Sequence, residues 1–268
     1  MSLPQPVPPS WKDLGKSSND LLGRDYHFSG TSLEVKTGTP SNVSFKVDGN
    51  RDSKSSFVSG NLEGKYTDKV HGLTFTQAWS TANALRTQIE LDNQIAKGLK
   101  LETTTILHPE KSAKSVVLGA AYKQPGLHSR AVLDVFKGPT FTADTVLGRD
   151  GFLIGAEASY NVSEGRVTKY SAAAGFSAPE YAVTFHGLSN LSTFAASYYH
   201  RVSPDVEAGA KAVYDTKATS PGVALEVGTK AYVSLQGLFG LALDTQRLND
   251  ASPTGPAHKV GAQFVFEA

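Results

Sequence analysis

Apolar and polar residues alternate along almost the whole chain, in segments of about ten residues. The alternation is clearest in residues 43–48, 85–91 and 223–230. A period of two residues places successive side chains on opposite faces of a β-strand. The pattern therefore predicts an all-β protein whose strands carry their charged residues on one face.

Turn-forming residues divide the chain after Tyr26 into about seventeen predicted strands, roughly one for every 13 or 14 residues. Examples are Asp48-Gly49-Asn50, Pro125-Gly126 and Arg149-Asp150-Gly151. Strands of about 9 to 11 residues separated by tight turns fit tilted crossings of a membrane. No shift in composition interrupts the series, so we expect one β domain over residues 26–268.

The number of strands indicates which face of the sheet contacts water. A soluble barrel shows the same alternation, but it closes with about eight strands because side chains or one ligand must fill its interior. Seventeen strands enclose a wider space, so we expect the polar face to line water. The apolar face of the predicted strands carries no Lys, Arg, Asp or Glu, and a Lys or Arg there costs about 2–4 kcal/mol at the middle of a membrane. The prediction is a transmembrane β-barrel of about 17 strands, with two stacked β-sandwiches as the alternative.

Residues 1–25 differ from the rest of the chain. Ser10 and Asp13 have the spacing of a capping box at a helix start. Beyond them, one helical face carries Trp11, Leu14, Ser18, Leu21 and Leu22, and the other carries Lys12, Lys16, Asn19 and Asp20. We expect an amphipathic helix of about three turns. An ordinary helix that caps a soluble core is the alternative.

Composition narrows the function. The chain has 26 Lys and Arg residues against 25 Asp and Glu, so it lacks the basic footprint of a nucleic-acid-binding protein. It has no cysteine, which excludes disulfides and thiolate chemistry. Its seven histidines show no metal-ligand spacing, and no Gly-x-Ser-x-Gly or phosphate-binding glycine loop is present. We expect neither an enzyme nor a cofactor.

The polar face supplies candidate charges for a pore wall, because rings of charge set the ion preference of a channel. Cations and carboxylates balance on this face, so counting predicts no preference for either ion sign. The candidates are Lys46, Lys65, Arg86, Lys100, Arg130, Lys169, Lys211 and Lys230, with Asp48, Glu63, Glu90, Glu102, Asp134, Glu157, Glu207 and Glu226.

Several segments occur together in an order typical of one family. They are Asp13-Leu14-Gly15-Lys16-Ser17, the stretch Gly72 to Trp79, Gly98-Leu99-Lys100, the stretch Val202 to Lys211, and a tail with Lys259, Gly261, Phe264 and Phe266. In these segments the chain resembles the voltage-dependent anion channel family of mitochondrial outer-membrane porins, most of all its fungal members.

The resemblance implies a voltage-gated, weakly anion-selective channel that passes ATP, ADP, phosphate and other small solutes across the mitochondrial outer membrane. It implies that Lys12, Lys16, Arg24 and Lys100 contact nucleotides and other small anions. It also implies that Leu14, Leu21 and Leu22 pack the helix inside the lumen.

The partners that the resemblance implies are membrane lipids and the mitochondrial β-barrel import and sorting machinery. That machinery would read Lys259, Gly261, Phe264 and Phe266 in the last strand. The resemblance leaves a homo-oligomer open and implies no nucleic acid.

Two features depart from the family. Gln77 stands where many animal members have a lipid-facing Glu, and between Tyr232 and Leu235 the chain lacks about two of the family's 19 strands. An odd strand count still allows the first and last strands to pair in parallel. A true 17-strand barrel and a splice or gene-model variant both stay open. The competing functions are a related outer-membrane barrel that translocates polypeptides and a soluble β-barrel carrier.

Overall fold

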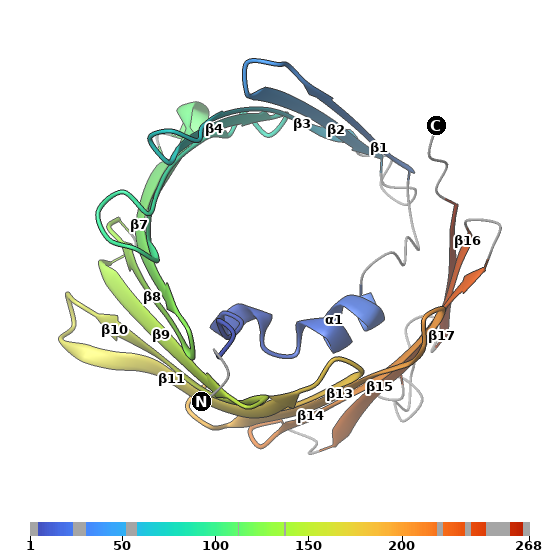
Figure 1. The fold of residues 1–268 in the computed structure, drawn as a ribbon. Coiled ribbons are helices and arrows are strands. Elements are labelled where there is room, and N and C mark those ends of the chain that lie inside the picture. The colour runs from blue at the N-terminus through green and yellow to red at the C-terminus, as the bar shows by residue number, and fades with distance from the viewer. Residues whose placement is uncertain are drawn as a thin grey trace. The chain divides into compact units, whose positions relative to one another are not determined.

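The computed structural model describes residues 5–23, 31–51, 58–111, 113–136, 138–218, 222–233, 237–244 and 258–264. These residues form one short α-helix, two 3-10 turns and seventeen strands (Figure 1). The helical elements are η1 (Trp11–Asp13), α1 (Lys16–Gly23) and η2 (Pro109–Lys111). The strands are β1 (Thr31–Gly38), β2 (Val43–Arg51), β3 (Val58–Asp68), β4 (Leu73–Ser80), β5 (Leu85–Asp92), β6 (Leu99–His108), β7 (Ala113–Gln124), β8 (Leu127–Asp134), β9 (Thr140–Arg149), β10 (Phe152–Asn161), β11 (Arg166–Ser177), β12 (Tyr181–Leu188), β13 (Thr193–Ser203), β14 (Val206–Asp215), β15 (Val223–Val233), β16 (Gly237–Asp244) and β17 (His258–Phe264).

The chain divides into two compact units. The β1–β8 unit comprises residues 29–144 and 158–168, and each of its eight complete strands pairs antiparallel with the next in sequence. The helix-bearing unit comprises residues 1–28, 145–157 and 169–268, and its strands β11 to β17 pair in the same way. Strands β9, β10 and β11 contribute residues to both units. The all-β fold predicted from the alternation is confirmed.

Strand register lines up the two kinds of side chain in rows across neighbouring strands. One row of the β1–β8 unit is apolar across six strands and then meets Lys114 on β7: Val35, Val47, Leu62, Trp79, Leu85 and Leu107. The next row, on the opposite face, contains Lys46, Glu63, Ala78, Arg86, Ile106 and Ser115. Large apolar side chains of the first row are about half exposed, Leu62 at 54% and Trp79 at 49%. A continuous exposed apolar face of this kind needs a nonaqueous neighbour.

The helix-bearing unit has the same two-faced sheet. Val183, Tyr198, Ala210 and Val227 line up across β12 to β15. The neighbouring row on the opposite face is Thr184, Ser197, Lys211 and Glu226.

One predicted turn is wrong. Pro125-Gly126 and Asp150-Gly151 connect strands as expected, but Asp48–Asn50 lies inside β2. Gly49 stands opposite Leu33 on one side and Gly60 on the other. Pairing with both neighbouring strands therefore overrides the local turn preference of this tripeptide.

Strand β15 pairs directly with β16, which agrees with a chain of about seventeen strands. The expected parallel pairing of β1 with β17 would join the two units and stays a prediction. Within the described ranges, no helix has the length and apolar character needed to cross a membrane.

Gly98 shows how tightly the turns hold neighbouring strands. It has a φ of +85°, and a Cβ atom at this position would lie 2.2 Å from the carbonyl oxygen of Lys123. Its own carbonyl accepts a hydrogen bond of 2.8 Å from the Lys123 N–H, and its N–H donates to Asn93 Oδ1 at 2.7 Å. Only glycine fits this conformation and this close approach.

We expect Gly98→Ala to destabilise the folded protein by about 1–3 kcal/mol, because the added methyl group meets backbone and the left-handed φ is strained. The measurement is the urea midpoint of unfolding in detergent micelles. Gly49→Ala is the matched control, since a Cβ at Gly49 would meet no atom within 4 Å. Equal midpoints for the two variants would contradict this prediction.

Candidate functional site

The N-terminal segment is not one continuous helix. The 3-10 turn η1 ends at Asp13, and α1 begins at Lys16 after Gly15, which has a φ of +73°. The expected capping box is also different, because the Ser10 hydroxyl donates to the Asp13 carboxylate at 2.6 Å and caps no backbone N–H. A Cβ on Gly15 would lie 2.7 Å from Thr184 Oγ1. The break at Gly15 therefore lets the segment approach β12 closely.

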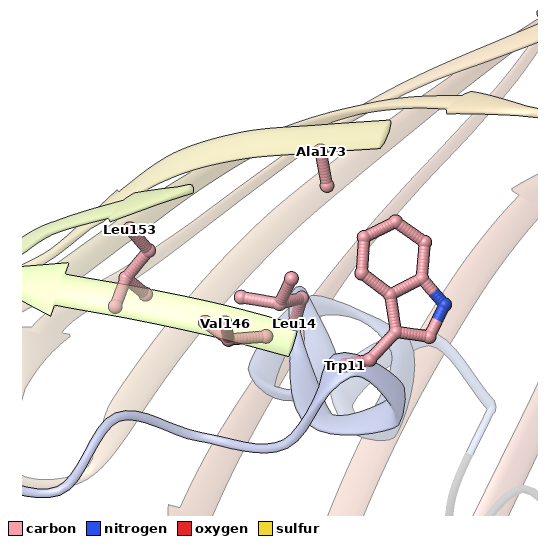
Figure 2. Close-up of a cluster of buried hydrophobic side chains, with 5 residues drawn as sticks. All are labelled: Trp11, Leu14, Val146, Leu153 and Ala173. Carbon is pink, nitrogen blue, oxygen red and sulfur yellow. The ribbon is translucent and has the colours of Figure 1, made fainter. Parts of the chain in front are cut away.

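An apolar cluster seats the first half of this segment on the sheet (Figure 2). Trp11 and Leu14 are 7% and 4% exposed, and they pack with Val146, Leu153 and Ala173. Burial of side chains of this size stabilises by about 1.5–3 kcal/mol each. The cluster therefore holds the start of the helical segment against the sheet.

Small residues of the sheet leave space for the side chains of the N-terminal segment. A Cβ on Gly155 would lie 3.0 Å from the Trp11 ring. On its other side, the Trp11 ring meets His186 edge-on at a centroid distance of 5.9 Å. Edge-to-face contacts of this kind add about 0.5–1.5 kcal/mol beyond area burial for pairs of aromatic rings.

Helix α1 has its own anchor on β13 to β15 (Figure 1). Leu21 and Ser18 are each 2% exposed. The Ser18 hydroxyl donates to the Ala210 carbonyl at 3.2 Å, and a Cβ on Gly209 would lie 2.9 Å from Leu21 Cδ2. The Lys211 ammonium donates to Asn19 Oδ1 at 2.9 Å.

The structure thus places two of the three leucines that were expected to pack, Leu14 and Leu21, in buried contact with the wall, and leaves Leu22 half-buried. On the opposite side, Lys12 and Lys16 are exposed. Lys16 lies 3.8 Å from Asp13 and 3.9 Å from Asp20.

Arg24 lies outside the described residues. Lys100 belongs to the β1–β8 unit, so its grouping with Lys12 and Lys16 stays a prediction.

A groove of about 500 Å³ lies between the N-terminal segment and β10 to β13 of the same unit. Its lining includes Asp13, Lys16 and Asp20 from the segment and the hydroxyls of Thr184 and Ser197 from the wall. The two carboxylates offset the ammonium, so the groove has no net attraction for anions.

The polar face of the β1–β8 unit carries a second cluster of charges. Glu90 on β5 and Glu102 on β6 stand directly opposite each other. Like charges in this position destabilise a sheet. Each carboxylate is drawn to its own cation: Lys100 donates to Glu90 at 2.8 Å, and Arg130 donates to Glu102 at 2.6 Å. Lys100, the expected nucleotide contact, is therefore held in an ion pair.

Two further wall cations are paired in the same way. Lys46 lies 2.9 Å from Glu34, and Lys169 lies 3.0 Å from Glu157. Within the described ranges, no group of three or more His, Asp or Glu residues is arranged to hold a metal ion.

The predicted sorting signal lies at the end of the chain. Lys259, Gly261 and Phe264 belong to β17, which pairs with β16, and Phe266 lies outside the described residues. Its recognition by sorting machinery stays a prediction.

Sequence reasoning did not identify the residues of the sheet that the N-terminal segment packs against. The alternation assigns Val146 and Leu153 to a strand face without showing that a helix covers them. The glycines at 155 and 209 gave a usable signal, because a glycine inside a strand often marks close approach by another element.

A family model described as eukaryotic porin matches residues 7–245. The chain belongs to this family. The mitochondrial outer membrane protein porin of Neurospora crassa is 42% identical over 287 aligned residues, which cover 97% of this porin and 99% of the relative. That alignment is longer than the 268 residues of this porin, so the relative carries residues without a counterpart here.

A second relative, the non-selective voltage-gated ion channel 1 of Saccharomyces cerevisiae, is 32% identical over 285 residues and covers 97% of this porin and 99% of its own length. A triple mutant of the Rhodopseudomonas blastica porin, a solved structure, has a TM-score of 0.52 at 9% identity and covers 89% of this porin and 97% of that chain. The fold is that of a porin β-barrel. Family membership confirms the prediction of a channel protein rather than an enzyme.

We expect Gly209→Val to displace α1, because even the first added carbon lies 2.9 Å from Leu21. Trp11 should then lose its apolar surroundings, and its fluorescence emission should shift to longer wavelength. The measurement uses a Trp79→Phe background, which leaves Trp11 as the only tryptophan.

Gly49→Val is the matched control, because a Cβ atom at Gly49 would meet no atom within 4 Å. An unchanged Trp11 emission in Gly209→Val would show that the position of the N-terminal segment does not depend on the close contact between Leu21 and Gly209.

Proposed function

We propose that this porin is a voltage-gated channel of the mitochondrial outer membrane that passes ions and small metabolites, including ATP, ADP and phosphate, with a weak preference for anions. The observation that carries the proposal is the two-faced sheet. Apolar rows with half-exposed Leu62 and Trp79 lie back to back with rows of charged and hydroxyl side chains.

The two faces have different solvents. Large apolar side chains with exposed fractions near one half suit contact with lipid tails. The opposite rows, which include Lys46, Glu63 and Arg86, need water. A soluble carrier would bury its apolar rows, so their exposure argues against that alternative. In a porin barrel, the polar rows line the bore.

The helix seat supports a role for the N-terminal segment in gating. Apolar contacts of Trp11, Leu14 and Leu21 hold the segment against the polar face of the sheet, where it narrows the aqueous path. Its exposed side carries Lys12 and Lys16. Movement of one charge through the membrane field releases about 2.3 kcal/mol per 100 mV. Movement of this charged segment through the field would therefore make the open state of the pore depend on voltage.

Relatives from Neurospora crassa and Candida albicans, both called mitochondrial outer membrane protein porin, support the proposed location. Strand β17 fits the same destination, since Lys259, Gly261 and Phe264 have the spacing that sorting machinery would read together with Phe266.

The test of the proposed function is reconstitution of the purified protein in a planar bilayer. We expect stepwise conductance, closure at elevated voltage of either sign, and a reversal potential in a KCl gradient that is displaced toward chloride. Heat-denatured protein in the same detergent is the control. A protein that stays monodisperse without detergent and forms no pore would overturn the proposal.

We expect deletion of residues 1–25 to raise the single-channel conductance and abolish closure by voltage, because the segment occupies part of the bore. Deletion of residues 1–4 is the matched control, since it leaves η1 and α1 intact. Unchanged conductance and gating after the longer deletion would contradict the role of this segment.

A further inference from the structure

The polar face of β4 to β6 carries an arginine that forms no ion pair with the described residues. Arg86 is exposed, and its Nη2 donates to the neutral side-chain oxygen of Gln88 at 2.7 Å. Its neighbours in register are Ala78 on β4 and Ile106 on β6. Neither neighbour offers a countercharge.

A chain of hydrogen bonds fixes this arginine in place. The Gln88 amide that accepts from Arg86 donates in turn to Glu90 Oε1 at 2.9 Å. The same oxygen accepts from Lys100 at 2.8 Å. Glu90 is thus committed to Lys100 and Gln88, and Gln88 is the neutral spacer that separates Arg86 from the carboxylate.

The other carboxylate on this face, Glu102, is also held in an ion pair. Glu102 reaches Arg130 across β7 at the position of Gly119, where a Cβ would lie 2.5 Å from Glu102 Cγ. The side chains of this pair are 23% and 24% exposed, so solvent screens it less than a surface pair. The two ion pairs are neutral overall, and Arg86 is left with one uncompensated positive charge.

Strand β3, on the far side of β4, carries charges of both signs on this face. Glu63 lies in the same row as Arg86 beyond Ala78 and stands opposite Lys46, which lies 2.9 Å from Glu34. Lys65, on the same face of β3, adds a second exposed cation. Two strand spacings of about 4.8 Å separate β3 from β5, which places both cations within reach of one extended anion.

We propose that Arg86, and not Lys100, is the anion-contacting cation of this wall and determines its preference for phosphate-bearing anions. The inference rests on the proposed channel function. A guanidinium has five N–H donors in a planar fork that matches phosphate oxygens. Here Gln88 accepts from Nη2 alone, and the arginine side chain is exposed. The ammonium of Lys100 already forms an ion pair with Glu90.

The test compares variants in planar bilayers by two measurements: the permeability ratio of chloride to potassium, and the reduction of single-channel current by ATP. Arg86→Gln should lower the permeability ratio and weaken the ATP effect about twofold to fivefold, the range of one exposed ion pair. The double variant Glu90→Gln/Lys100→Gln keeps the net charge, and a glutamine at position 90 can still accept from Gln88. It should behave like the unmodified protein.

Arg86→Lys separates the effect of the positive charge from that of the planar guanidinium group. It should retain the permeability ratio, because the charge is kept, and lose part of the ATP effect, because the fork is lost. Voltage-dependent closure of each variant shows that the barrel is assembled.

Two results separate this inference from the proposed function. A gated pore in which Arg86→Gln matches the unmodified protein, or in which the Glu90/Lys100 double variant loses as much, would overturn the role of Arg86 alone. An unmodified protein that forms no pore would overturn both.

Discussion

The structure depends on one constraint: each strand must satisfy its backbone hydrogen bonds through its neighbours, because hydrocarbon offers no partner. This explains why β2 continues through Asp48–Asn50, where paired strands on both sides outweigh a local turn preference. It also explains the tight connection at Gly98, whose N–H donates to Asn93 in the turn and whose carbonyl accepts from Lys123 on β7. With the backbone satisfied, the side chains are free to divide between two solvents.

The polar face carries out two tasks with different residues. In the helix-bearing unit, small residues such as Gly155 and Gly209 give up side-chain volume so that Trp11 and Leu21 can be buried. In the β1–β8 unit, long charged residues on the same face pair across strands and leave Arg86 exposed. One alternation pattern thus supports a seat for a helix and a charged wall for solutes.

The fold could be predicted from the sequence because a period of two survives any choice of register, so the two faces of the strands followed from it. Turn-forming residues between the strands supplied the approximate strand count. The details of the site could not be predicted in this way. The ion pair of Lys100 depends on β6 meeting β5 with Glu90 in reach, and alternation does not fix that register. The break at Gly15 was missed because the helical spacing of Trp11, Leu14 and Ser18 continues across it.

Gly119 has no side chain, yet the pairing of charges on this face depends on it. Its empty position is the passage through which Glu102 meets Arg130 two strands away. Any larger residue there would push the carboxylate aside and unmask a guanidinium without altering the formal charge of the protein. An uncharged substitution at this position would thus register as a change in permselectivity, and a survey of lumen residues confined to ionisable groups would overlook it.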